Sequence, residues 1–89
     1  MVKKNELLRQ LSEGRFVFGT WSNIPSPTVT NILCKAGLDF IVLDLEHGPA
    51  TFETVENQMY AAEADGVSPV VRIGEVDEKA ILHALEIGA

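Results

Sequence analysis

The segment 40–49 constrains the fold of this chain more than any other. Its first four residues, 40–43, form a continuous apolar run, and Asp44, Glu46 and His47 follow at once. A strand without polar alternation is typical of a parallel sheet that is covered on both faces by helices. The charged cluster is therefore expected at the carboxyl end of a buried strand, where parallel α/β folds place their chemistry.

The rest of the chain repeats this strand-to-helix rhythm. The apolar runs predict strands over 16–21, 40–43 and 68–73. Four helical patterns surround them, with start and stop signals at their ends. The predicted helices are 3–13 with Gly14 as its stop, a helix opened by Pro25 and Pro27 and closed by Gly37, a helix capped by Thr51 and ending before Gly66, and a helix capped by Asp77 and followed by Gly88.

One helix followed by three strand–helix units predicts an α/β fold. The order fits the first three β/α units of a (β/α)8 TIM barrel, with parallel strands and helices outside, or the start of a doubly wound sheet. A closed barrel needs about 250 residues. We therefore expect residues 1–89 to be the N-terminal part of a single barrel domain, truncated before its fourth strand.

The composition excludes several classes of function. A formal charge of −6, a pI near 4.7 and only seven basic residues argue against non-specific nucleic-acid binding. The apolar runs are far shorter than the ~18–20 residues that span a bilayer, so no membrane partner is expected. Cys34 is the single cysteine, which excludes an internal disulfide and suits a reducing compartment. Polar residues from Glu6 onward interrupt any signal sequence, and the protein is predicted to be cytoplasmic.

Polar or aromatic residues end all three predicted strands, at Trp21, at the cluster Asp44, Glu46 and His47, and at Arg72. Equivalent ends of parallel strands lie together, so these side chains are expected around one site. A carboxylate such as Asp44 can orient the imidazole of His47 and raise its basicity, as a general base requires. Glu46 can orient His47 or bind a metal-bound water. Arg72 suits an oxygen that becomes negative during a reaction.

The residues alone leave plainer interpretations open. Asp44 and Arg72 can simply pair across neighbouring strand ends, with Glu46 capping a turn. Trp21 is as readily a core residue as the wall of a pocket. Cys34 is interpreted as a small core residue, and His83 as a hydrogen-bonded or half-exposed helix histidine rather than a ligand.

Several motifs together resemble one family. Gly19-Thr20-Trp21 after the first strand, the segment 43–49 after the second and the segment 69–72 at the third are similar to the HpcH/HpaI aldolases, the metal-dependent class II pyruvate aldolases. The closing segment 81–89 resembles the helix before the fourth strand of that family. The resemblance covers nearly the whole chain, in order.

The resemblance implies a (β/α)8 barrel that reversibly cleaves 4-hydroxy-2-oxo acids to pyruvate and an aldehyde through a metal-bound pyruvate enolate. It implies Mg²⁺, Mn²⁺ or Co²⁺ as cofactor and a homo-oligomeric enzyme with small-molecule partners. His47, paired with Asp44, would be the acid/base, and Arg72 would hold the keto oxygen and stabilise the enolate. Glu46 would bind a metal-bound water, and Trp21 would line the substrate pocket.

The family places its acidic metal ligands on later strands, so the resemblance implies no metal ligand within this chain. An isolated 89-residue polypeptide is then expected to be inactive. Two alternatives stay open. The chain is a non-catalytic β/α fragment or assembly module that pairs with itself or with a missing partner segment, or it belongs to a barrel lyase acting on acyl-coenzyme A substrates. The Glu46-His47 motif speaks against the second of these.

Overall fold

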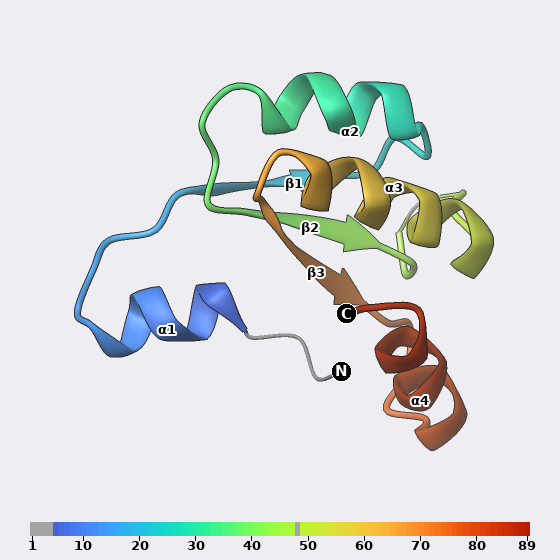
Figure 1. The fold of residues 1–89 in the computed structure, drawn as a ribbon. Coiled ribbons are helices and arrows are strands. Elements are labelled where there is room, and N and C mark those ends of the chain that lie inside the picture. The colour runs from blue at the N-terminus through green and yellow to red at the C-terminus, as the bar shows by residue number, and fades with distance from the viewer. Residues whose placement is uncertain (1–4, 48) are drawn as a thin grey trace.

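The chain folds as a three-stranded parallel sheet whose strands are joined through helices (Figure 1). The computed structural model describes residues 5–47 and 49–89. Its elements are α1 (Glu6–Ser12), β1 (Gly19–Ser22), α2 (Pro27–Cys34), β2 (Phe40–Asp44), α3 (Phe52–Ala64), β3 (Ser68–Arg72) and α4 (Glu78–Glu86). The predicted α/β class and the predicted order of helix and strand are both confirmed.

The strands lie in the order β1-β2-β3, and their register divides the side chains between two faces. Residues paired in register share a face of a parallel sheet, and successive residues alternate. Ile41 and Leu43 of β2 point to the face that α2 and α3 cover, which we call the helix face. Phe40, Val42 and Asp44 point to the opposite face, which we call the open face.

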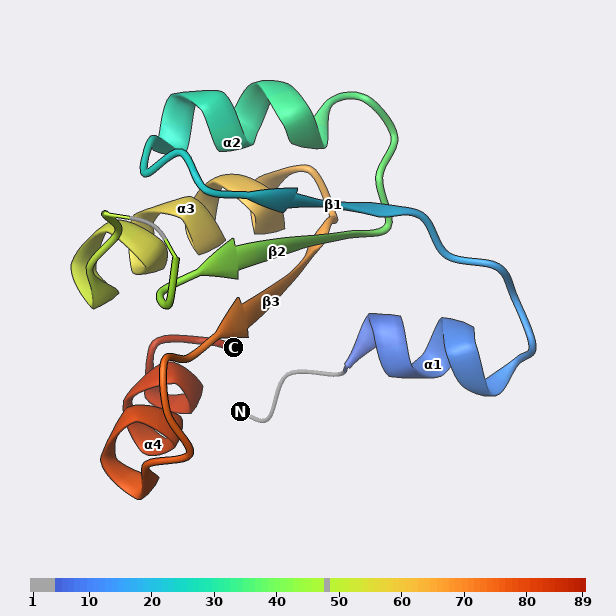
Figure 2. The same ribbon diagram turned by 180° about the vertical axis from the view of Figure 1, so that it is seen from behind.

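The hydrophobic core lies between the helix face and two helices. Figures 1 and 2 show α2 and α3 side by side over one side of the sheet. Ile41 and Leu43, both fully buried, pack there against side chains from both helices and from the turn before β3: Cys34, Val55, Met59, Ala62 and Val67. The prediction that Cys34 is a small core residue is confirmed.

A buried glutamine ties the two helices together. Gln58 of α3 is 1% exposed, and its Nε2 donates to Oγ1 of Thr30 on α2 at 3.0 Å and to the carbonyl oxygen of Ile24 at 2.9 Å. A buried amide is costly unless its donors are satisfied. These two hydrogen bonds satisfy both N–H donors of Gln58 and hold the β1–α2 loop against α3.

The helix starts follow the predicted capping residues. The Thr51 hydroxyl accepts from the N–H of Thr54 at α3, and the Asp77 carboxylate accepts from the N–H of Lys79 at α4. Gly88 follows α4 with a φ of 121°, a conformation that glycine adopts readily. Only the second of the two prolines enters α2: Ser26 is the N-cap and Pro27 the first helical residue.

The first strand and the first helix differ most from their predicted bounds. The first strand begins at Gly19 rather than at residue 16, because the partner strand begins only at Phe40, opposite Gly19. Phe16 and Phe18 are 93% and 71% exposed. The first helix begins at Glu6, with Asn5 as its N-cap, and it ends at Ser12; the predicted start at residue 3 lies outside the described residues.

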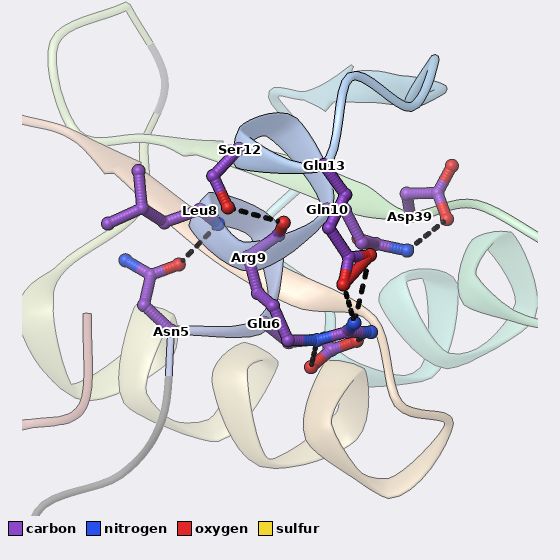
Figure 3. A network of polar contacts seen from close by, with 8 residues as sticks. All are labelled: Asn5, Glu6, Leu8, Arg9, Gln10, Ser12, Glu13 and Asp39. Carbon is purple, nitrogen blue, oxygen red and sulfur yellow. Dashed lines mark hydrogen bonds and ion pairs between the residues drawn. The ribbon is translucent and has the colours of Figure 1, made fainter.

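Helix α1 lies apart from α2 and α3, near the end of the sheet where the strands begin (Figures 1 and 2). None of its residues is buried. Figure 3 shows its polar network, in which Arg9 pairs with Glu6 and Glu13, and Gln10 donates to Asp39 just before β2 at 3.3 Å. Surface pairs of this kind stabilise little, so α1 contributes little to the core of this chain.

The second and third strands are both apolar runs in the sequence, but they differ in burial. Residues 41–44 of β2 are buried, whereas every residue of β3 is half-buried or exposed. Val70, on the open face, is 36% exposed. Among the described residues β3 has a neighbouring strand on one side only, and no helix lies over its open face, which explains the difference.

Candidate functional site

The strand register brings three of the predicted site residues to one place. Asp44, at the end of β2, is paired with Arg72, at the end of β3. Trp21 of β1 is paired with Val42, two residues before Asp44, so its side chain is on the open face as well. The carboxyl ends of all three strands therefore contribute to one site, as the sequence pattern predicted.

Asp44 is the buried centre of this site. The residue is 3% exposed, and its carboxylate accepts hydrogen bonds from the main-chain N–H groups of Glu46 at 2.7 Å and His47 at 3.0 Å. The indole Nε1 of Trp21 donates to Oδ2 at 2.9 Å, and Nη1 of Arg72 lies 3.6 Å from the same oxygen. Four groups thus surround one carboxylate, and each of them favours its charged form.

These contacts lower the pKa of Asp44 from its ordinary value of 3.8 to about 2. The hydrogen bond from the main-chain N–H of His47 contributes most, and those from Trp21 and Glu46 and the charge of Arg72 act in the same direction. Burial opposes the shift, because it disfavours the charged carboxylate. Asp44 is therefore ionised throughout the physiological pH range.

Glu46 links the imidazole to the guanidinium. Its Oε1 lies 2.8 Å from Nε2 of His47, and the same oxygen accepts a hydrogen bond from Nη2 of Arg72. The side chain of His47 is 65% exposed and that of Arg72 is 35% exposed, so both remain accessible to solvent. One carboxylate oxygen thus holds together the two side chains with which the site can move a proton and bind an anion.

The imidazole of His47 has a different partner from the predicted one. We expected a carboxylate–imidazole pair with Asp44, but Asp44 accepts the main-chain N–H of His47, while the imidazole contacts Glu46. The reason is geometric, because the tight turn after β2 folds the main chain of residues 46 and 47 back over the Asp44 carboxylate. The ion pair between Asp44 and Arg72, which the plainer interpretation predicted, is also present.

Sequence reasoning missed the polar role of Trp21. It considered the side chain as a pocket wall or as part of the core, and the structure shows a half-exposed ring whose N–H is bonded to Asp44. The guanidinium carbon of Arg72 lies over the same ring, 5.3 Å from its centroid. The available signal was the position of a tryptophan on the strand next to a buried carboxylate, since a partly buried indole N–H usually finds an acceptor.

The remaining side chains that were weighed lie elsewhere. His83 stacks on Phe52 with ring centroids 4.1 Å apart, at the start of α3. A cavity of about 310 Å³ is lined mostly by apolar residues: Leu45, Ala50, Thr51, Phe52, Ile73, Gly74 and Ala80. None of the five predicted site residues lines this cavity.

No metal site can be assembled from the described residues. Within residues 5–47 and 49–89, no three histidine, cysteine, aspartate or glutamate side chains are grouped so that they could hold a metal ion. Glu46 and Asp44 are already engaged by Arg72 and by hydrogen-bond donors. None of the helices in this part of the chain is both long enough and apolar enough to cross a membrane.

The fold and the site together define a class: an α/β protein with a parallel sheet and a polar site at the carboxyl ends of its strands. A family model, HpcH/HpaI aldolase/citrate lyase, matches residues 17–89. The chain belongs to this family, and the fold class predicted above, the first three β/α units of a TIM barrel, is confirmed by its structural neighbours.

Individual relatives agree with this assignment. A hydroxypyruvate/pyruvate aldolase from Paraburkholderia phytofirmans is 36% identical over 85 residues, which are 96% of this chain and 32% of the relative. An HpcH/HpaI aldolase from Desulfitobacterium hafniense superimposes with a TM-score of 0.85 at 38% identity, over 93% of this chain and 32% of that one. The citrate synthase SbnG gives a TM-score of 0.88 at 35% identity, over 93% of this chain and 34% of that one. The chain thus spans about a third of the length of its relatives.

Proposed function

We propose that this chain is the N-terminal third of a (β/α)8 aldolase, residues 1–89 being part of one barrel domain, that reversibly cleaves 4-hydroxy-2-oxo acids to pyruvate and an aldehyde. The observation that carries the proposal is the meeting of His47, Glu46 and Arg72 around one oxygen at the carboxyl edge of the sheet, in a family of aldolases and citrate lyases. We further propose a cytoplasmic homo-oligomer.

Arg72 is assigned to the substrate's keto oxygen. Cleavage of the C3–C4 bond of a 4-hydroxy-2-oxo acid releases C4 as the aldehyde and leaves the enolate of pyruvate, whose negative charge on the C2 oxygen needs a fixed donor. The guanidinium has a permanent charge and a planar fork of N–H groups. Glu46 and Asp44 occupy part of that fork in this structure, so the substrate must compete with Glu46, the more exposed of the two carboxylates.

His47 is assigned to the proton of the substrate's 4-hydroxyl group. Cleavage requires removal of that proton, and the reverse reaction requires its return, which an imidazole can perform because it both accepts and donates a proton. The carboxylate of Glu46 holds Nε2 and so restricts the ring's orientation. Asp44 acts through the main chain. Its hydrogen bond from the N–H of His47 fixes the position of the His47 backbone, from which the imidazole side chain extends.

A divalent cation, proposed for the full-length enzyme, would supply Lewis acidity toward the 2-oxo acid. The described residues do not make a site for it. We propose that its ligands lie outside residues 1–89. Mg²⁺, Mn²⁺ and Co²⁺ are the ions to test.

The direct test is aldol cleavage by the full-length protein. Pyruvate release from a set of 4-hydroxy-2-oxo acids is followed through the NADH consumed by lactate dehydrogenase, before and after treatment with a chelator. We expect activity that is lost on chelation and restored by one of the three ions. Cleavage only of acyl-coenzyme A substrates would instead favour the barrel lyase alternative that the sequence left open.

A second candidate function rests on the open face. Trp21 is 51% exposed and Val70 36%, so this face presents apolar side chains to solvent. An assembly module that pairs with itself or with a missing partner segment would bury these residues. Sedimentation of the isolated chain tests this candidate, and a folded monomer would count against it.

A further inference from the structure

Trp21 makes contacts that the wall of a substrate pocket does not need. It is the chain's single tryptophan and lies on β1, with β2 between it and Arg72. Its indole crosses the open face, and Nε1 donates to Oδ2 of Asp44 at 2.9 Å. Asp44 is one of the most buried polar residues of the described chain, so this hydrogen bond fixes the ring to a rigid point.

The face of the same indole meets Arg72. The guanidinium carbon is 5.3 Å from the ring centroid, within the ~6 Å over which a cation is attracted to an aromatic ring. Nη1 of Arg72 is also 3.6 Å from Oδ2 of Asp44, the oxygen that accepts the indole N–H. The ring and the carboxylate therefore hold Arg72 from two sides, and the indole N–H joins these two supports.

The third contact of Arg72 is of a different kind. Glu46 belongs to the loop after β2, and its side chain is 31% exposed, whereas the side chain of Asp44 is 1% exposed. An anionic ligand that reaches Arg72 can replace Glu46, but it cannot replace a buried carboxylate and a ring fixed to it. The supports from Trp21 and Asp44 therefore persist when a ligand is bound.

We propose that Trp21 is a positioning residue for Arg72: it holds the guanidinium against the buried carboxylate, and its effect on catalysis passes through that guanidinium. This inference rests on the aldolase function proposed above and deepens it. A long arginine side chain has many rotamers, and a displacement of about 1 Å from the reacting oxygen is costly in rate. A pocket-wall residue would act instead on the substrate directly.

The test is a double-mutant cycle in the full-length protein. Trp21→Phe keeps a ring beneath Arg72 and removes the N–H, and Trp21→Leu removes both. We expect kcat to fall about tenfold in the first and about thirtyfold in the second, with KM changed less than twofold.

Arg72→Ala lowers turnover roughly 10²–10³-fold, as loss of one oxyanion donor does, and in that background neither substitution lowers kcat further. Tyr60→Leu, which removes another exposed aromatic ring, on α3, leaves kcat unchanged.

The opposite pattern would overturn the proposal. A rise in KM at unchanged kcat, by the same factor with and without Arg72, assigns Trp21 to direct substrate contact. Thermal unfolding of each variant establishes that the comparison is made between folded proteins.

A readout without substrate keeps this inference separate from the proposed function. The Nε–Hε resonance of Arg72 feels the ring current of Trp21, so Trp21→Leu is expected to move it and Trp21→Phe to move it less. If the protein cleaves no 4-hydroxy-2-oxo acid, the proposed function fails while this contact is still measured. An unmoved resonance in Trp21→Leu rules out the positioning role.

Discussion

At the scale of single residues, Asp44 divides its two carboxylate oxygens between two tasks. Oδ1 accepts the main-chain N–H groups of Glu46 and His47 and so shapes the loop after β2. Oδ2 accepts the indole N–H of Trp21 and faces Arg72. One buried side chain therefore sets both the path of the loop that carries the imidazole and the position of the guanidinium.

Removal of the charge of Asp44 should change how stability depends on pH. Its pKa is about 2 in the folded protein against an ordinary value of 3.8, so the unfolded chain binds more protons between these values and stability rises with pH there. The stabilisation is fully present above about pH 4 and is lost as the pH falls through about 2. Asp44→Asn should lower the urea midpoint of the full-length protein at pH 7, and the difference from the parent should shrink from pH 4 to pH 3. A difference that stays constant with pH would contradict the assigned pKa.

The two histidines of the chain form a matched pair for testing the acid/base assignment. His47→Gln in the full-length protein should lower kcat by about 10²–10⁴, the usual contribution of a general acid/base. His83→Gln alters an exposed ring that stacks on Phe52 at the start of α3, so kcat should stay within twofold of the parent. Steady-state turnover of both variants decides the matter. Equal effects of the two substitutions would remove His47 from the mechanism.

At the scale of elements, the sequence predicted what local chemistry determines. Capping chemistry predicted the N-caps Thr51 and Asp77, and the apolar run predicted the strand that begins at Phe40. The structure agrees in all three cases. The first strand was predicted too long because a strand's length depends on its partner, which here begins only at Phe40. The partner of the imidazole was missed because the turn after β2, and not the residue types, decides which carboxylate it reaches.

The pairing of β1 with β2 depends on the absence of a side chain at Gly19. A Cβ built there would lie 2.4 Å from the ring of Phe40, its register partner, which lies across the glycine. Gly19→Ala must therefore displace that ring or separate the strands, at about 1–3 kcal/mol of unfolding free energy. Gly74→Ala is the matched control, since a Cβ there meets nothing within 4 Å, and its effect should stay within about 0.5 kcal/mol.

Denaturant unfolding of the full-length protein measures both glycine substitutions. In a Phe40→Ala background the added methyl group at position 19 has no ring to displace, and the cost of Gly19→Ala should largely disappear. A cost that persists without the ring would show that the strain lies in the backbone of β1 instead.

At the scale of the whole molecule, the two faces of the sheet differ in what this chain can supply. The helix face is covered by α2 and α3 and has a continuous core. The open face holds Trp21, Asp44 and Arg72 together with the partly exposed Val70, and no helix of the described chain lies over it. The sequence predicted a sheet covered on both faces, because a strand's apolar residues are suited to the surroundings that the strand has in the complete fold. This chain spans only about a third of the length of its relatives, so it supplies the covering for one face.

This difference predicts how the 89-residue polypeptide behaves when it is made alone. Among the described residues β1 and β3 each pair on one side only, which leaves unpaired N–H and C=O groups beside an apolar open face. We expect sedimentation velocity at ~10–100 µM to show dimers or larger species, since burial of apolar surface drives association. Val70→Lys places a charge on the open face and should shift the chain toward monomer. Val76→Lys changes a residue that is 98% exposed in the β3–α4 loop and should leave association unchanged. A parent chain that sediments as a folded monomer would show that the open face needs no partner. That result would contradict the alternative in which the chain is an assembly module.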